Sequence, residues 1–127
     1  MKAKVLVCVV DDDALIRESL SDLLHAAGYQ AACFESTESF LASEDRGGCG
    51  CVVTDIHMTG LTGVDLVRRI STSPHPPKVI LITGHAEESW RERALYCGAD
   101  GFLRKPIESK TLLDLVERIL APDPRPA

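Results

Sequence analysis

Short apolar runs alternate with helical patterns along the chain, and this alternation limits the fold more than any other feature. The first run, VLVCVV at 5–10, is apolar throughout, as expected of a strand covered on both faces. The next segment carries apolar side chains at helical spacing. The pair of patterns recurs; we expect strands at 4–10, 29–34, 51–54, 78–82 and 100–105, and helices at 14–27, after Ser36, at 64–70, at 86–97 and over the apolar stripe Leu112, Leu115, Val116, Ile119 and Leu120.

Five strand–helix units in this order favour an α/β fold, in which a parallel sheet carries helices on both faces. The length of 127 residues suits one domain, which we assign to residues 1–121. The Pro-rich residues 122–127 are expected to be a disordered tail or the start of a linker. The pattern alone leaves the strand order open, and it also leaves open whether the chain stands alone or begins a longer protein.

Local signals mark the ends of several elements. Asp13 directly precedes the first helix and is expected to cap it, and Ser36 is expected to cap the short second helix. Gly28 is expected to end the first helix. Residues 44–50, EDRGGCG, are predicted to form a loop.

Charge and composition exclude several classes of partner. The net charge is −5 and the pI is about 5.3, so no basic surface favours nucleic-acid binding. The longest apolar run has six residues, too few to span a bilayer, and the chain runs on into DDD without a signal-peptide cleavage site. The five cysteines form no CxxC pair, and we expect buried, reduced thiols in a cytoplasmic protein.

Polar side chains gather where the predicted strands end. Asp11 and Asp12 follow the first strand, Asp55 the third, Thr83 the fourth and Lys105 the fifth. Because parallel strands end at one edge of a sheet, we expect these side chains to meet there. Consecutive residues of an extended chain point to opposite sides, so Asp11 and Asp12 cannot both lie in the same plane of ligands.

Three carboxylates at one edge require a counter-charge, and Mg²⁺ is the usual choice where phosphate is handled. Lys105 adds a fixed positive charge for a phosphoryl oxygen, and Thr83 adds a hydroxyl donor. Asp55 has a second option, because a carboxylate can attack phosphorus and form an acyl phosphate. A single Asp at a strand end is usually a turn or cap residue, so the hypothesis depends on the joint occurrence of these groups.

Four segments together resemble the receiver domain of two-component response regulators, most closely the FixJ-type receivers. They are VVDDD at 9–13, TDIHMTGLTG at 54–63, LITGHAE at 81–87 and FLRKP at 102–106. The resemblance covers residues 4 to about 120. It implies a flavodoxin-like (βα)5 fold, with five parallel strands in the order 2-1-3-4-5 and helices on both faces.

The resemblance also implies a role for each site residue. Asp55 would accept a phosphoryl group from a phosphohistidine on a sensor histidine kinase. Asp12 would bind Mg²⁺ directly, Asp11 mainly through water, and the backbone carbonyl of His57 would be a further ligand. Lys105 would pair with the phosphoryl group, and Thr83 would hydrogen-bond it. Phe102 would be the aromatic switch, and the Lys105–Pro106 bond would be cis.

Such a protein would be a signalling switch and not an enzyme acting on an external substrate. Phosphorylation would change the surface formed by the helix at 86–97, the strand at 100–105 and the last helix, and could promote a homodimer. Trp90 would belong to that surface, although a core position for this residue stays open. This segment would bind neither nucleic acid nor membrane; FixJ-type regulators commonly carry a helix-turn-helix after the receiver.

The chain departs from the family pattern after the phosphoacceptor. Thr59 and Gly60 follow Met58, where receivers usually have Pro, so we expect a mobile loop at 57–62. In the family, the positions of His57 and His85 tune the lifetime of the phosphoryl group, where a histidine would either orient or block the attacking water. Two other functions are alternatives to the signalling switch. One is a Mg²⁺-dependent phosphohydrolase of the haloacid dehalogenase type, and the other is a degenerate receiver used only for protein–protein interaction.

Overall fold

A computed structural model describes residues 5–43, 48–56, 62–73, 75–84 and 98–121 of the chain. The elements, in chain order, are β1 (Leu6–Val10), α1 (Ala14–Ala26), β2 (Gln30–Phe34), α2 (Thr37–Leu41), β3 (Cys49–Asp55), α3 (Gly63–Ile70), β4 (Lys78–Thr83), β5 (Gly101–Arg104) and α5 (Ser109–Leu120). The helix predicted at 86–97 and the tail predicted at 122–127 lie outside the described residues, so both stay predictions.

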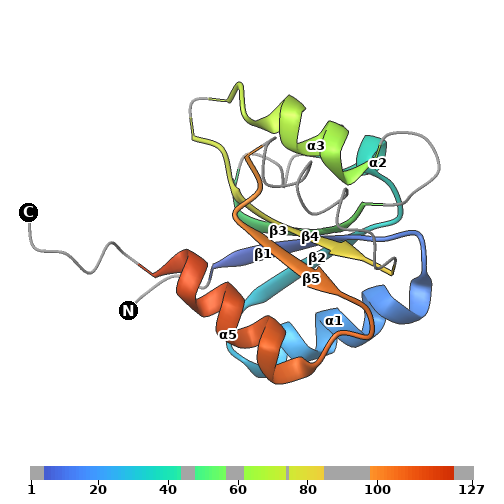
Figure 1. Cartoon of the computed structure of the whole chain (residues 1–127), viewed down its shortest axis with the longest axis vertical. Helices are drawn as coiled ribbons and strands as arrows, with labels where there is room; N and C mark the ends of the chain where they lie inside the picture. The colour runs from blue at the N-terminus through green and yellow to red at the C-terminus, as the bar shows by residue number, and fades with distance from the viewer. Residues whose placement is uncertain (1–4, 44–47, 57–61, 74, 85–97, 122–127) are drawn as a thin grey trace, which may run out of the picture.

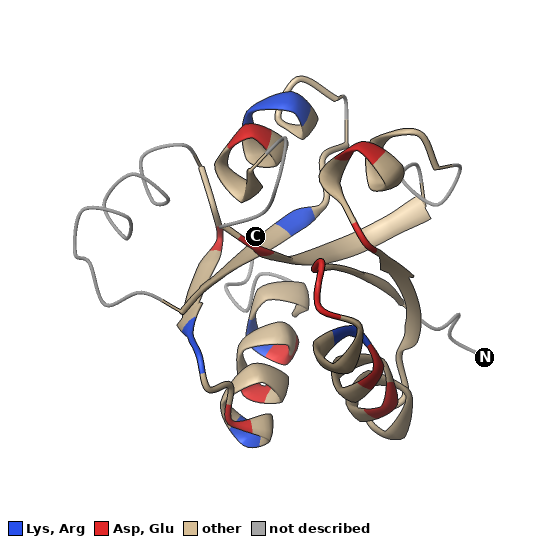
Figure 2. Cartoon of the chain, turned by 90° about the vertical axis from the view of Figure 1, so that its right-hand side faces the viewer, with Lys and Arg blue, Asp and Glu red and all other residues tan. Residues whose placement is uncertain are grey.

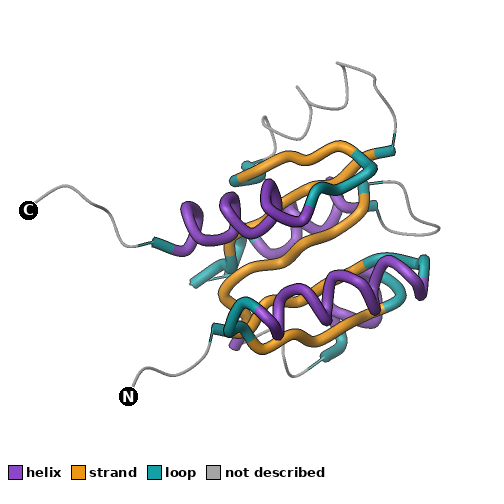
Figure 3. Tube along the Cα trace, turned by 90° about the horizontal axis from the view of Figure 1, so that it is seen from below, coloured by secondary structure: helices purple, strands orange, loops and turns teal. Residues whose placement is uncertain are grey.

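All five strands are parallel and lie in the order β2-β1-β3-β4-β5, which confirms the predicted fold class and strand order. The helices α1 and α5 cover one face of the sheet, and α2 and α3 cover the other (Figure 1). Seen from below, α1 and α5 lie across the face that is turned to the viewer (Figure 3). None of the helices in the described ranges has the length and apolar character that a bilayer span requires.

The uniformly apolar strands follow from this layering. In β1, Val7 and Val9 pack in the core beneath α1 and α5, whereas Cys8 and Val10 pack in the core on the α2 and α3 side. All four side chains are fully buried. A strand with both faces covered has no solvent-exposed face, so its sequence shows no polar alternation.

The predicted helix ends are observed. The Asp13 carboxylate accepts hydrogen bonds from the backbone N–H groups of Leu15 and Ile16 at the start of α1, and the Ser36 hydroxyl accepts one from Ser39 at the start of α2. Gly28 follows α1 with φ of 97°, a left-handed conformation that costs glycine little. The two N-caps fix where α1 and α2 begin, a few residues after the strand that precedes each helix.

At the start of α3, Thr62 and Asp65 form a reciprocal capping box. The backbone N–H of Thr62 donates to the Asp65 carboxylate, and this bond is the main cause that lowers the pKa of Asp65. The capping box therefore fixes the first turn of α3, which follows the undescribed residues 57–61.

The prediction of a loop over 44–50 is wrong at its C-terminal end, because β3 begins at Cys49 and not at Cys51. Leu6 pairs with Cys49 and Val7 with Cys51, so Gly50 is an extra residue opposite β1. A Cβ atom at Gly50 would lie 2.8 Å from the Val5 side chain. The glycine that made this segment look like a loop is the residue that the bulge requires. The edge strand β5 covers residues 101–104 and is shorter than the predicted strand at 100–105.

The cysteines differ in exposure. Cys8, Cys49 and Cys51 are buried and form no disulfide within the described part of the chain, and burial is the main cause that raises the pKa of Cys51 to about 12. Cys33 is free but exposed on the edge strand β2, so the expectation of a buried thiol is wrong there. One face of an edge strand can remain partly open, which its apolar neighbours in the sequence do not reveal.

At Gly63, α3 approaches the end of β3 too closely to leave room for a side chain. A Cβ atom at Gly63 would lie 2.8 Å from the backbone oxygen of Asp55 and 2.9 Å from the side chain of Leu81. We expect Gly63→Ala to lower the free energy of unfolding by about 1–3 kcal/mol, since the backbone oxygen cannot move aside. Denaturant unfolding measures this change.

Gly48→Ala is the matched control, because a Cβ atom there would meet nothing within 4 Å. It should leave the free energy of unfolding within about 0.5 kcal/mol of the parent value. Equal stability of the Gly63→Ala variant and this control would contradict the close approach.

Candidate functional site

The ends of the parallel strands bring the predicted residues to one edge of the sheet. Asp11 directly follows β1, Asp55 is the last residue of β3, Thr83 is the last residue of β4, and Lys105 directly follows β5. Figure 2 shows the acidic connection between β1 and α1 as a red stretch where the chain leaves the sheet. Residues far apart in the sequence are therefore neighbours at this edge.

Lys105 joins the two buried carboxylates of the site. Its Nζ donates a hydrogen bond of 2.6 Å to Oδ2 of Asp55 and lies 3.6 Å from Oδ2 of Asp11, an ion-pair distance. Asp11 is 1% exposed and Asp55 is 5% exposed. Partial burial lowers the pKa of Lys105, but the hydrogen bond and charge of Asp55, with the charge of Asp11, outweigh it and raise the pKa above its usual value.

Asp11 is the carboxylate with unused bonding capacity. Its Oδ1 accepts a hydrogen bond of 2.9 Å from the backbone N–H of Asp13. Its Oδ2 is buried and has no hydrogen-bond partner in the described part of the chain. Burial is the main cause that raises the pKa of Asp11; the bond from Asp13 and the charge of Lys105 lower it, and the charges of Asp55 and Asp12 raise it further. A buried carboxylate oxygen that forms an ion pair with Lys105 but no hydrogen bond is costly to bury.

The other acidic residues of the DDD segment are placed differently. Asp12 is exposed, in contrast to the buried Asp11, which agrees with the expected opposite directions of consecutive side chains. The Asp13 carboxylate caps α1, and the residue contacts the cluster of Asp11, Asp55 and Lys105 through its backbone N–H, which donates to Asp11. The fourth predicted ligand, His57, lies outside the described residues.

Thr83 and Phe102 belong to neighbouring strands and to the same side of the sheet. Leu81 pairs with Phe102 in the register of β4 and β5, and both pack in the core on the α3 side. Thr83, two residues after Leu81, therefore faces that side as well. The side chain of Thr83 is fully buried, whereas Phe102 is half-buried. The backbone carbonyl of Thr83 accepts a hydrogen bond of 2.7 Å from the backbone N–H of Lys105, which ties the two strand ends together.

The Lys105–Pro106 peptide bond is cis, as the resemblance implied.

The acidic side chains of the site fit a hard cation that is held by few protein ligands. Asp11, Asp12 and Asp55 supply carboxylate oxygens, and Oδ2 of Asp11 is buried without a hydrogen bond within the described ranges. No ready group of three His, Cys, Asp or Glu side chains positioned for a metal exists among the residues that the structure describes. Mg²⁺ suits such a partial set, because it retains several waters and needs only one or two carboxylates.

The family model for the response regulator receiver domain matches residues 7–117. The chain belongs to this family. The transcriptional regulatory protein FixJ of Bradyrhizobium diazoefficiens is 36% identical over 117 residues, which cover 92% of this chain and 57% of that protein. The chain thus spans little more than half the length of this relative, and other curated relatives are covered to a similar extent.

Solved structures agree with the family. The structure described as FixJ-N has a TM-score of 0.83 and 30% identity, and the match covers 94% of this chain and 95% of that chain. The chemotaxis protein CheY4 of Vibrio cholerae has a TM-score of 0.84 and 27% identity, and the match covers 93% of this chain and all of that one. The chain is thus a response-regulator receiver domain of the two-component type, a class of signalling switches that generally bind Mg²⁺ at the site of phosphorylation.

One residue of the site escaped the sequence prediction. The guanidinium of Arg17, in the second turn of α1, donates a hydrogen bond of 2.7 Å to the backbone carbonyl of Asp11. Its position one turn after the cap was a signal, since a long side chain there points back toward the N-terminus of the helix. The choice of a carbonyl as its partner could not be read from the sequence.

The raised pKa of Asp11 generates a prediction on pH. A carboxyl group whose pKa is higher in the folded than in the unfolded chain makes folding less favourable as the pH rises from 3.8 through the folded-state pKa. In EDTA at pH 7, Asp11→Asn should therefore raise the melting temperature, because it removes a buried charge and retains the oxygen that accepts from Asp13. The advantage should narrow as the pH is lowered through the raised pKa of Asp11 toward the ordinary value of 3.8, because the carboxyl group then takes up its proton in the folded chain.

The exposed Asp12 provides the control for this experiment. Asp12→Asn removes the same charge from the same turn, but its effect on the melting temperature should be smaller because water solvates that carboxylate. A lower melting temperature for Asp11→Asn than for the parent chain at pH 7 would show that the ionised Asp11 is not costly in the folded protein.

Proposed function

We propose that this chain is a phosphorylation-dependent signalling switch in which Asp55 accepts a phosphoryl group from a phosphohistidine of a sensor histidine kinase. The position of Lys105 carries the proposal. Its ammonium lies 2.6 Å from Asp55 and 3.6 Å from Asp11 at the carboxyl edge of the sheet. A cation fixed beside a buried carboxylate at this edge is suited to hold the oxygens of a transferring phosphoryl group.

The reaction requires an in-line displacement at phosphorus. A carboxylate oxygen of Asp55 attacks the phosphorus, the P–N bond to the donor histidine breaks, and its electron pair stays on the imidazole nitrogen. The product is an acyl phosphate on Asp55 and a histidine free of phosphate. Lys105, which donates a hydrogen bond to Asp55 in this structure, would then hold an oxygen of the phosphoryl group. The hydroxyl of Thr83 would form a hydrogen bond with another oxygen of that group.

Mg²⁺ is the cofactor that the donor set fits. Asp12 and Asp55 would bind it directly, Asp11 mainly through water, and the backbone carbonyl of His57 would be a further ligand. When bound, the ion would neutralise charge on the phosphoryl group during transfer. Oδ2 of Asp11 supports this assignment, because it lies at an ion-pair distance from Lys105 but has no hydrogen bond within the described residues, and a cation or its water would satisfy it.

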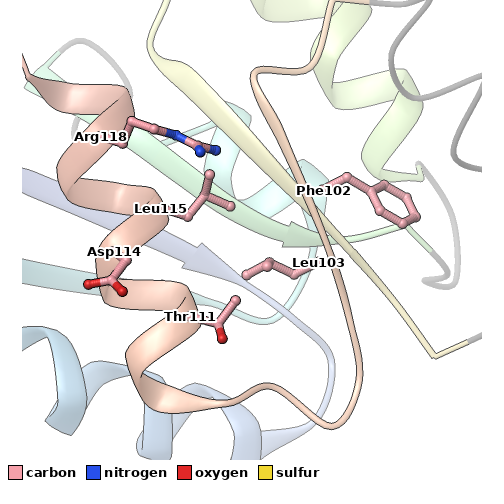
Figure 4. Close-up of a pocket in the computed structure, with 6 residues that line it drawn as sticks. All are labelled: Phe102, Leu103, Thr111, Asp114, Leu115 and Arg118. Atoms are coloured by element: carbon pink, nitrogen blue, oxygen red, sulfur yellow. The ribbon is translucent and has the colours of Figure 1, made fainter.

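The new dianionic group would bias an equilibrium between two conformations. Thr83 would move toward it, and Phe102, on the same side of the sheet, would turn inward. The surface that changes would comprise the segment 86–97, β5 and α5, and it could support a homodimer. A groove of about 380 Å³ lies next to β5 on this surface. In Figure 4 the Leu103 side chain points toward α5, whereas the Phe102 side chain points away from it. The residues that line the groove are Phe102, Leu103, Thr111, Asp114, Leu115 and Arg118.

A second groove, of about 300 Å³, adjoins the site and offers a surface for the phosphoryl donor. It lies between α1 and the β5–α5 connection; its lining residues are Leu15, Ile16, Ser19, Leu20, Lys105, Pro106 and Ile107. Lys105 belongs both to this groove and to the site, so a donor histidine that reaches Asp55 passes beside it. Leu15 is 74% exposed, an unusual position for a large apolar side chain unless a partner covers it.

Phosphorylation by a small-molecule donor tests the proposal. Incubated with acetyl phosphate and Mg²⁺, the parent chain should gain the mass of one phosphoryl group, and hydroxylamine should remove it. Asp55→Asn should gain none. Asp22→Asn, at an exposed position of α1, removes the same charge away from the site and should gain one group like the parent chain.

The other outcomes separate the competing functions. A phosphohydrolase would release many equivalents of phosphate without a stable mass increase. A degenerate receiver would show neither the mass increase nor turnover. Either result, or a mass increase that survives in Asp55→Asn, would contradict the proposed function.

Leu15 generates a separate prediction on the donor surface. With an autophosphorylated histidine kinase or phosphotransfer domain that phosphorylates the parent chain, Leu15→Ala should lower the second-order rate constant about tenfold, since it removes apolar contact area worth about 1–2 kcal/mol. With acetyl phosphate, which needs no protein contact, the rate should not change. The ratio of the two rate constants is the measurement.

Val5→Ala is the control for this ratio, because Val5 is the other exposed large apolar residue of the described chain and precedes β1. Its two rate constants should match those of the parent. Equal loss from both donors in Leu15→Ala would mean that the substitution damages the site and does not remove a contact with the donor protein.

A further inference from the structure

Arg17 reaches from α1 back to the strand end that carries the acidic residues. Its Nη1 donates a hydrogen bond of 2.7 Å to the backbone carbonyl of Asp11, and the side chain is half-buried. The backbone N–H of Arg17 donates to the carbonyl of Asp13 at 3.1 Å. Arg17 therefore holds the connection between β1 and α1 at two points, one with its backbone and one with its side chain.

The bonds of Asp11 leave one atom for a ligand. Its backbone N–H donates to the carbonyl of Phe34 at 3.1 Å, and its carbonyl accepts from Arg17. Its Oδ1 accepts from the N–H of Asp13 at 2.9 Å. The remaining polar atom, Oδ2, is buried, lies 3.6 Å from the ammonium of Lys105, and has no hydrogen bond in the described ranges. Hydrogen bonds thus hold the backbone and Oδ1 of Asp11, and Oδ2, beside Lys105, is the polar atom of this residue that forms none within the described residues.

The bond from Arg17 acts on Asp12 as well as on Asp11. The carbonyl of Asp11 belongs to the planar peptide group that joins these two residues, so fixing the oxygen fixes the orientation of the whole group. The direction in which the Asp12 side chain leaves the backbone depends on that orientation. The hydrogen bond from Arg17 therefore orients the backbone from which both carboxylates project, while the bond from Asp13 holds the Asp11 carboxylate itself.

The choice of a carbonyl as acceptor matters for the charge of the site. A guanidinium bound to the Asp11 carboxylate would occupy oxygens that a metal needs and would neutralise them. Bound to the carbonyl, it orients the ligands and leaves their oxygens available.

We propose that Arg17 is a positioning residue for the divalent cation, acting through the Asp11–Asp12 peptide group and not by contact with the metal or the phosphoryl group. This inference rests on the proposed function, because it assumes that Asp11 and Asp12 serve a Mg²⁺ site. Residues that orient metal ligands typically change metal affinity by 10–100-fold when they are replaced. Arg17 should have an effect of this size although it is not itself a ligand.

Three variants separate orientation from charge and from folding. Arg17→Met removes both the donor and the charge, whereas Arg17→Lys keeps the charge and offers an ammonium of different geometry. Arg68→Met removes the same charge from an exposed position of α3 and is the matched control. Calorimetric titration with MgCl₂ gives the dissociation constant of each protein, and denaturant unfolding in EDTA gives its stability without metal.

Arg17→Met should raise the Mg²⁺ dissociation constant at least about tenfold, Arg17→Lys should lie between it and the parent, and Arg68→Met should match the parent. In acetyl phosphate reactions the Mg²⁺ concentration for half-maximal rate should rise by the same factor in Arg17→Met. The rate at saturating Mg²⁺ should stay within about twofold of the parent, because Asp55, Lys105 and Thr83 are intact.

A purely structural role gives a different result. If Arg17→Met lowers the stability in EDTA but leaves the dissociation constant of Mg²⁺ at the parent value, the proposal is wrong. If Arg17→Met does not fold, the Mg²⁺ dissociation constant of Arg17→Lys is compared with the parent value instead, and an unchanged constant likewise contradicts the proposal. A parent chain that binds no Mg²⁺ would instead contradict the proposed function, so the two failures are distinguishable.

Discussion

The contact of one ammonium group with two buried carboxylates is the interaction on which the rest of this structure depends. Lys105 lies 2.6 Å from Asp55 and 3.6 Å from Asp11, and both acids are almost fully buried. Two neighbouring buried carboxylates repel each other and lose hydration, so their burial requires a nearby positive charge. One fixed lysine offsets this only in part, because the pKa of Asp11 is still raised. The remaining deficit of positive charge favours a divalent ion.

The surrounding fold holds these groups in place. Parallel strands end at the same edge, which places the carboxyl ends of β1, β3 and β5 along one side of the sheet although β4 separates β3 from β5 and the residues are far apart in the sequence. Gly63 lets α3 contact the backbone of Asp55, and Arg17 and Asp13 brace the turn that carries Asp11. A site whose groups are held by secondary structure and hydrogen bonds loses little energy to reorganisation when a ligand binds. The apolar core and the polar edge are thus parts of one arrangement.

Much of this arrangement could be predicted from the sequence, because hydrophobic periodicity and caps are local signals. The sheet, the helix starts at Asp13 and Ser36 and the polar strand ends agree with the structure. The strand order came from the resemblance and not from the pattern. The bulge at Gly50, the exposed Cys33 and the bond from Arg17 were missed. Each of these depends on a contact between distant segments or on the position of a strand at the sheet edge, which periodicity does not report.

A crystal grown with MnCl₂ tests the central claim most directly, because Mn²⁺ replaces Mg²⁺ and its position is visible by anomalous scattering. The account predicts one strong peak at the carboxyl edge of the sheet, about 2–2.5 Å from carboxylate oxygens of Asp55 and Asp12, with Asp11 in contact directly or through water. The ammonium of Lys105 should remain beside Asp55. A fully occupied Mn²⁺ site elsewhere on the molecule, or no peak within reach of Asp55 at millimolar Mn²⁺, would contradict it.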